Sequence, residues 1–390
     1  MKVSKSILPL IVLAQFCCTS LWFAGNAVMP QLVHQFDLLP GALGHLTSAV
    51  QLGFIFGTLL FAVLSFADRY SPSRVFFVSA LLGAGFNLAV IWEGHTFISL
   101  LLCRVLTGVF LAGIYPVGMK IAADYYQKGL GKSLGFLVGA LVLGTAFPHL
   151  LSDLTTSLAW ESVLMLTSAL AVIGGILIWS FVPDGPYRKA SFQLDLSGFW
   201  KVFKVKSFRK AAFGYFGHMW ELYAFWAFVP VMLSLYEQFH PDTQLNIALL
   251  SFLIIGVGSL SCVAAGYLSQ RFGAPRIAAL ALAISGSCCL ISPWMFGLQN
   301  EYLFIGFLVV WGLAVIADSP LLSSLVAQHA PAAQKGTALT IVNCIGFSIT
   351  IVSIQLLNTL NLNTNPFSIY VVLAIGPILG LLALRMKSDH

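Results

Sequence analysis

Long apolar stretches recur along this chain from its beginning to its end. Each is about 20 residues long, the length that an α-helix needs to cross the roughly 30 Å hydrocarbon core of a bilayer. A membrane strand needs only about 9–11 residues, so stretches of this length favour helices over a barrel. We predict twelve spans, near residues 7–29, 43–66, 74–92, 97–120, 133–152, 160–182, 211–236, 245–269, 275–297, 301–325, 336–358 and 366–385.

The composition agrees with lipid as the solvent for these stretches. Of 390 residues, 58% are hydrophobic and 9% are charged, whereas soluble domains carry about 25% charged residues. The first stretch resembles a secretory signal peptide, but it is long enough to span, and we expect a retained first helix. All seven cysteines lie inside apolar runs without CxxC spacing, which predicts neither a disulfide framework nor a metal site.

The basic residues indicate the orientation of the spans. When Lys2 and Lys5 are placed in the cytoplasm and the loops are counted alternately, Arg104 is the only one of 20 basic residues that lies away from the inner side. The outer loops carry acids instead. Because Lys and Arg accumulate in cytoplasmic loops, we predict a multi-pass protein of the cytoplasmic (inner) membrane with both termini in the cytoplasm. The net charge of +6 then reflects topology, and the case for nucleic-acid binding disappears.

One long polar interval, residues 183–210, divides the chain into six spans plus six. We predict a six-helix bundle over 1–182, a basic cytoplasmic linker over 183–210, and a second six-helix bundle over 211–390. The linker begins with a Pro/Gly turn and continues with basic residues interleaved with aromatic ones. This pattern favours a short amphipathic helix near the lipid surface.

The two halves carry related sequences. LSFADRYSPSR (64–74) aligns without gaps with GYLSQRFGAPR (266–276), so that Arg69 corresponds to Arg271, 202 residues later. A second pair links IYPVGMK (114–120) with ADSPLLSS (317–324). Parallel repeats of this kind are typical of transporters, which place their binding site at the repeat interface.

The loop sequence ADRYSPSR resembles the signature of the major facilitator superfamily, roughly G-x-x-x-D-R-x-G-R-R. It departs from the signature at Leu64 and Ser71, and the second copy has Gln270 in place of the acid. RVLTGVFLAG, with Arg104 and Gly108, resembles the family's R-x-x-x-G element. The resemblance implies an all-α membrane protein of the bacterial twelve-helix type, with two pseudo-twofold-related six-helix bundles around a central cavity. It also implies a cytoplasmic gate, formed here by Asp68, Arg69, Arg74, Arg271 and Arg276.

In this family, helices one, four, seven and ten line the cavity, and most intramembrane polar residues of the chain fall on them. Ionisable side chains inside a membrane are costly and tend to mark functional sites. The candidates for proton coupling or substrate binding are Trp22, Asn26, Arg104, Tyr115, His218, Glu221, Tyr223, Trp226, Trp311 and Asp318.

The stretch GYFGHMWELYAFW (214–226) contains the strongest candidate, Glu221. His218 lies three residues earlier, so we expect the two side chains to share a helix face and form a hydrogen bond. Such a pair can titrate near physiological pH, as a proton-coupled carrier requires. The alternative is a buried pair that only holds helices together.

Asp318 and Arg104 each allow two interpretations. Asp318 precedes Pro320, which loosens a helix, so it is either a second proton or cation site or a capping acid at a kink. Arg104 stays charged and must meet an acid, helix carbonyls or an anionic substrate. The aromatic candidates either stack on a substrate or cage a cation, or they pack or form an interfacial belt.

These features predict a proton-coupled secondary active transporter for a small organic solute, working as a monomer in the lipid bilayer without a cofactor. One alternative is a proton-driven efflux antiporter for drugs or amphipathic cations, because GFLVGALVLGTAFP (135–148) partly resembles the antiporter motif of the family. Another is a receptor or scaffold that does not transport. An enzyme is not expected, since no HExxH, GxSxG or other nucleophile–base pair is present.

Overall fold

The computed structural model describes residues 6–126, 130–188, 202–331, 335–363 and 367–386. Within these ranges every regular element is a helix. Contacts between Cα atoms divide the chain into two compact units, Met1–Leu194 (unit 1) and Asp195–His390 (unit 2). The amphipathic helix predicted for the linker falls largely on residues 189–201, which lie outside the described ranges.

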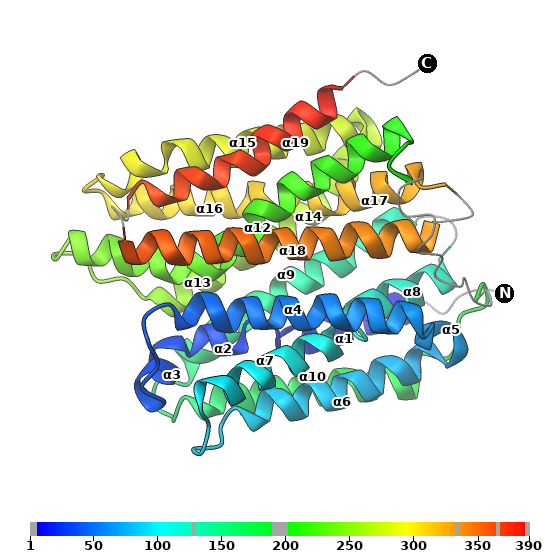
Figure 1. Cartoon of the computed structure of the whole chain (residues 1–390), viewed down its shortest axis with the longest axis horizontal. Helices are drawn as coiled ribbons and strands as arrows, with labels where there is room; N and C mark the ends of the chain where they lie inside the picture. The colour runs from blue at the N-terminus through cyan, green and yellow to red at the C-terminus, as the bar shows by residue number, and fades with distance from the viewer. Residues whose placement is uncertain (1–5, 127–129, 189–201, 332–334, 364–366, 387–390) are drawn as a thin grey trace. The chain divides into compact units, whose positions relative to one another are not determined.

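Unit 1 runs through ten helices before the linker (Figure 1). They are α1 (Ile7–Thr19), α2 (Ala24–Ala27), α3 (Met29–Gln35), α4 (Ala42–Val63), α5 (Phe66–Arg69), α6 (Pro72–Ala89), α7 (Phe97–Leu111), α8 (Tyr115–Tyr125), α9 (Leu130–Leu154) and α10 (Glu161–Phe181).

Unit 2 has a corresponding succession of helices (Figure 1). They are α12 (Lys206–Phe239), α13 (Ile247–Gly256), α14 (Gly258–Phe272), α15 (Ala274–Phe296), α16 (Glu301–Ala317), α17 (Ser319–His329), α18 (Lys335–Asn363), the 3-10 helix η3 (Ile369–Ala374) and α19 (Ile375–Arg385).

Ten helical segments among the described residues are long and apolar enough to cross a membrane. Two shorter apolar helical segments, Ile7–Thr19 and Ile369–Arg385, lie at the first and last predicted spans. The first predicted span, 7–29, is interrupted, because α1 stops at Thr19 and α2 begins only at Ala24. This interruption exposes backbone carbonyls that a continuous helix would satisfy.

The fourth and tenth spans are both broken at matching places. α7 gives way to α8 just before Pro116, and α16 gives way to α17 just before Pro320. A proline lacks the backbone N–H and its ring clashes with the preceding turn, so a helix breaks on its N-terminal side. The two prolines are 204 residues apart, which shows the repeat in the backbone as well as in the sequence.

A glycine crossing also recurs in both units. A Cβ atom on Gly108 of α7 would lie 2.1 Å from the carbonyl oxygen of Val50 on α4. A Cβ atom on Gly312 of α16 would lie 2.1 Å from the carbonyl oxygen of Ile254 on α13. Small residues let membrane helices approach to backbone contact, so each unit is built around the same close crossing. α4 and α7 run side by side in Figure 1.

Candidate functional site

Glu221 lies in the interior of unit 2, with 1% of its surface exposed. Its carboxylate accepts hydrogen bonds from Ser285 Oγ (2.9 Å), Cys289 Sγ (3.2 Å) and Trp311 Nε1 (2.6 Å). Ser285 and Cys289 are one turn apart on α15, and Trp311 is on α16. The indole also packs against Phe225, with ring centroids 4.8 Å apart. Three uncharged donors from two helices therefore satisfy this acid.

The predicted hydrogen bond between His218 and Glu221 is wrong. His218 Nδ1 instead lies 2.8 Å from Asp318 Oδ1, and both side chains are almost fully buried. Residues three apart on a helix point about 60° away from each other. On α12 that angle is enough to direct Glu221 toward α15 and α16, while His218 meets the break between α16 and α17.

Asp318 occupies this break. Its backbone carbonyl accepts the N–H groups of Leu321 and Leu322 at 3.0 and 2.8 Å, so the main chain starts the next helix. Its side chain does not cap that helix but faces His218. The interpretation of Asp318 as a side-chain cap at a kink is therefore wrong. The Asp318 carboxylate instead links the break between α16 and α17 to His218 on α12.

Arg104 is the buried cation of unit 1, 2% exposed on α7. Its Nη2 donates to the carbonyl oxygens of Trp22 (2.8 Å) and Leu21 (3.4 Å), and its Nη1 donates to Asn87 Oδ1 (3.1 Å). Both carbonyls belong to the interruption between α1 and α2. An acid, helix carbonyls or an anionic substrate were expected as partners of Arg104. Among the described residues it contacts backbone carbonyls at a helix interruption and, in addition, a side-chain amide.

Sequence reasoning did not single out Asn87. Its amide donates to Thr167 Oγ1, Ser168 Oγ and the carbonyl of Leu164 on α10, at 3.2, 3.0 and 3.3 Å. These bonds leave its Oδ1 turned toward Arg104. The signal available in the sequence was an asparagine near the apolar end of a predicted span, because a buried amide needs several hydrogen-bonding partners.

The remaining cavity candidates pack within their own units. Trp22 lies 4.9 Å from Phe54 between ring centroids, and Asn26 Nδ2 donates to Thr47 Oγ1 at 2.8 Å. Tyr223 contacts Trp226, with ring centroids 5.2 Å apart. Tyr115 is the first residue of α8 and is partly buried. These contacts agree with packing and do not test substrate binding.

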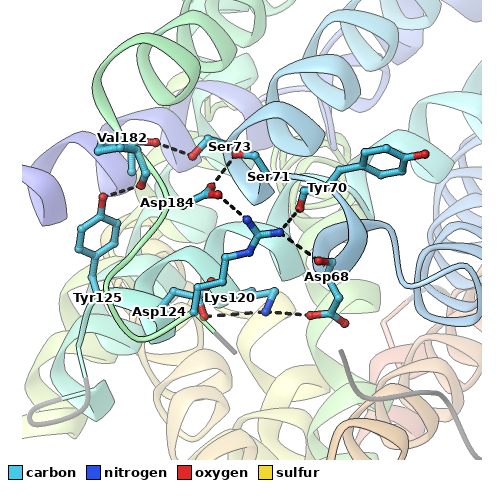
Figure 2. Close-up of polar contacts among 11 residues, drawn as sticks. Asp68, Tyr70, Ser71, Ser73, Lys120, Asp124, Tyr125, Val182 and Asp184 are labelled. Carbon is cyan, nitrogen blue, oxygen red and sulfur yellow. Dashed lines mark hydrogen bonds and ion pairs between the residues drawn. The ribbon is translucent and has the colours of Figure 1, made fainter. Parts of the chain in front are cut away.

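A polar cluster surrounds the predicted gate loop in unit 1 (Figure 2). Asp68 Oδ1 lies 3.0 Å from Lys120 Nζ of α8, and Lys120 Nζ lies 3.8 Å from Asp124 Oδ1. The acid of the loop therefore meets a cation from α8 of the same unit.

The start of the linker is fastened to the same loop. Arg188 pairs with Asp184 and donates to the backbone carbonyls of Asp68 (3.0 Å) and Tyr70 (2.8 Å). Ser71 Oγ donates to Asp184 Oδ1 at 2.6 Å, as Figure 2 shows. Ser73 Oγ donates to the carbonyl oxygen of Val182, and the Tyr125 hydroxyl donates to the carbonyl oxygen of Pro183. Residues 182–188 thus hold the loop against α8 and α10.

The gate prediction identified only part of this cluster. Lys120, Asp124, Asp184 and Arg188 were not chosen as site residues, although Lys120–Asp124 and Asp184–Arg188 have the i,i+4 spacing of helical ion pairs. Among the described contacts of the cluster, none involves Arg69 or Arg74. In unit 2, the Arg271 guanidinium lies 5.2 Å from the ring of Phe272.

Among the described residues, no group of three or more His, Cys, Asp or Glu side chains is arranged to hold a metal ion. The buried carboxylate and imidazole side chains of unit 2 among the described residues are those of His218, Glu221 and Asp318. Such groups inside a membrane can bind protons or charged solutes.

A family model of the Major Facilitator Superfamily matches residues 11–354. The protein called uncharacterized transporter YgaY from Escherichia coli O157:H7 is 23% identical over 191 residues. This match covers 47% of this chain and 47% of that relative, so the chain spans about half the length of the relative it matches.

Two solved structures resemble the whole chain. The human organic anion transporter MFSD10 gives a TM-score of 0.76 at 16% identity, covering 99% of this chain and 100% of that one. The proton:xylose symporter XylE gives a TM-score of 0.75 at 14% identity, covering 97% and 95%. At these identities the similarity establishes the fold.

Proposed function

This chain belongs to the Major Facilitator Superfamily of transporters, and on that premise we propose that it is a secondary active transporter for a small organic solute. The solute crosses the cytoplasmic membrane by alternating access, and protons moving down their gradient supply the free energy. We place both termini in the cytoplasm on the distribution of Lys and Arg, and we expect a monomer.

The observation that carries the coupling proposal is the pair formed by His218 and Asp318. The two side chains lie 2.8 Å apart and are buried in two helical segments that are each long and apolar enough to cross a membrane. Burying titratable groups there is costly, and membrane carriers use such groups as proton relays. The pair also joins an unbroken helix, α12, to the break of the tenth span.

The position of the pair suggests how a proton changes the protein. A proton that reaches the pair either neutralises the carboxylate or charges the imidazole, and both events alter the attraction between His218 and Asp318. The attraction acts at the α16–α17 break, where Pro320 has already removed a backbone hydrogen bond. Protonation there would alter the angle between the two half-helices, which is the kind of step that alternating access requires.

Glu221 has a different role from that pair in the proposed mechanism. Its three donors come from α15 and α16 and bind it without a countercharge. Hydrogen bonds to a carboxylate favour its charged form. We propose that Glu221 fixes α12 to these helices, whereas the His218–Asp318 pair carries the coupling proton.

Purified protein in liposomes containing a pH-sensitive dye tests this function. The first probe is xylose, because a structural neighbour carries xylose with protons. We expect addition of a transported solute outside to acidify the lumen. Asp318→Asn should abolish this acidification while solute binding persists, and Glu301→Gln, an acid at the start of the same span, should leave it intact.

Three results would contradict the proposal. Solute uptake that proceeds without proton entry removes the coupling. Acidification that persists in Asp318→Asn would show that the His218–Asp318 pair does not carry the coupling proton. Energised inverted vesicles that accumulate ethidium in their lumen, in the absence of uptake by liposomes, would assign the chain to proton-driven efflux instead.

A further inference from the structure

An apolar groove of about 520 Å³ runs along the outer surface of unit 2, between α12, α18 and α19. Glycines shape it: a Cβ atom on Gly217 would lie 2.4 Å from the carbonyl oxygen of Gly376, and one on Gly376 would lie 2.3 Å from that of Gly217. α12 and α19 therefore touch through their backbones. Larger side chains rise on both sides of this contact and leave the hollow between them.

The walls of the groove are entirely apolar. Phe213, Phe216 and Trp220 of α12 form one wall, and Leu379 and Leu382 of α19 form the other. The two leucines are 58% and 57% exposed. The Trp220 ring is fixed by a hydrogen bond from its Nε1 to the carbonyl oxygen of Val372, at 3.1 Å. The groove is thus accessible on the side of these two leucines, and at least one wall is held in place without a ligand.

Basic residues gather at one end of the groove. α12 begins with Lys206, Arg209 and Lys210, and α19 ends with Arg385. Lys206 and Arg209 precede Phe213 by seven and four residues, which places them on the same face of α12 as the groove wall. Neither the first four turns of α12 nor any of α19 contains an acid. We call these four cations the basic end.

The length of the groove matches one leaflet of a bilayer. From Ile375 to Met386, its wall on α19 spans eleven helical steps, or about 16 Å. Half of the hydrocarbon core is about 15 Å. The basic end therefore falls where phosphates lie, and anionic lipids of the cytoplasmic leaflet attract Lys and Arg at that depth.

We infer that this groove binds an acyl chain of an anionic phospholipid, whose phosphate is held by the basic end. Only an occupant that is apolar over about 16 Å and negatively charged at one end satisfies both parts of the site. The inference rests on the orientation given in the proposed function but not on transport itself, because it concerns a surface groove of unit 2.

Native mass spectrometry of the delipidated full-length protein tests the inference, with palmitoyl-oleoyl-phosphatidylglycerol and the matching phosphatidylcholine as probes. Phosphatidylglycerol should bind more tightly. Lys210→Gln and Arg385→Gln should each weaken it about fivefold, whereas Arg276→Gln at another helix end should not. Leu382→Trp and Leu379→Trp should fill the groove and reduce retention of both lipids.

Leu260→Trp is the matched control, because Leu260 is 68% exposed on α14 outside the groove. It should retain both lipids normally and melt at the same temperature as the groove variants. Equal binding of the two lipids, or normal retention in both groove variants, would overturn the inference. So would a dimer that Leu382→Trp dissociates, because the groove would then hold a second copy of the chain.

Discussion

Arg104 of unit 1 and Leu308 of unit 2 lie 204 residues apart, and both are buried on the helix that makes the close glycine crossing. One is a cation and the other is apolar. The same spacing relates Trp22 to Trp226, both fully buried aromatic residues. The repeats thus share their packing positions and differ in where they place charge.

The acids of unit 2 show the reverse difference. At the same spacing, the residues corresponding to His218, Glu221 and Asp318 in unit 1 are Ala14, Cys17 and Ile114, all of them buried. At these positions unit 1 therefore buries apolar side chains where unit 2 buries two acids and a histidine, although unit 1 also buries Asp124 and His149 elsewhere. Residues packed at the close glycine crossing tolerate little change in size, whereas a buried charge needs only hydrogen-bonding partners nearby.

The cytoplasmic clusters differ in the same way. Lys120 and Asp124 of unit 1 correspond to Ser324 and Gln328 of unit 2, and Asp68 corresponds to Gln270 in the loop alignment. Gln328 Nε2 donates to Ser324 Oγ at 3.0 Å, which preserves the i,i+4 contact without charge. Among the described residues, unit 2 thus keeps an i,i+4 contact at this place without an ion pair.

The shared glycine crossing gives the largest expected effect. Gly108→Leu and Gly312→Leu should each destabilise the protein by about 1–3 kcal/mol or more, because each side chain would collide with a backbone carbonyl. Melting of the purified variants in detergent measures this loss. Gly306→Leu is the control on α16, since nothing lies within 4 Å of a Cβ atom there. A tolerated Gly312→Leu beside a damaging Gly108→Leu would break the equivalence of the two crossings.

The two buried acids of unit 2, Asp318 and Glu221, should respond differently to replacement by their amides. Asp318→Asn is expected to remove the pH dependence of transport, since a carboxamide cannot exchange a proton with His218. Glu221→Gln should keep that dependence but lower stability by about 1–3 kcal/mol, because the amide NH₂ faces other donors. Solute uptake at several pH values, with melting curves, compares them. The opposite pattern would make Glu221 the coupling acid.

Arg104 should behave as a structural cation. Arg104→Leu is expected to cost about 1–3 kcal/mol of stability, because it leaves the carbonyl oxygens of Leu21 and Trp22 without a donor. The pH dependence of the residual transport should not change. Transport and melting of Arg104→Lys, which restores a donor, provide the comparison. A stable Arg104→Leu protein that no longer binds the solute would show instead that Arg104 contacts the substrate.

The gate clusters give the smallest effect on stability. Asp68→Asn should change the melting temperature little, since Asp68 and Lys120 are each about one quarter exposed and such pairs contribute about 0–1 kcal/mol. It should nevertheless slow transport if the cluster holds the gate. Gln270→Ala, at the corresponding place in unit 2, should affect neither. Equal slowing by both changes would mean that the latch does not depend on charge.

Much of the fold could be predicted from local sequence. The length of the apolar stretches, the repeated prolines at Pro116 and Pro320, and the alternation of basic residues all act through the residue itself or its immediate neighbours. A proline removes one backbone N–H, but Pro148, Pro230 and Pro293 lie inside continuous helices, so the breaks before Pro116 and Pro320 also depended on their surroundings. The interruption of the first span was not predicted, because no proline or glycine marks residues 20–23.

The partners of the buried charges depended on the tertiary structure. Glu221 bonds to residues 64, 68 and 90 positions away, and Arg104 reaches carbonyls 82 and 83 positions away. Sequence alone showed that these groups are costly in a membrane and need partners. It favoured the neighbour His218 for Glu221 because three residues along a helix are close. The helix packing decided otherwise, since a rotation of about 60° turns each side chain toward a different helix.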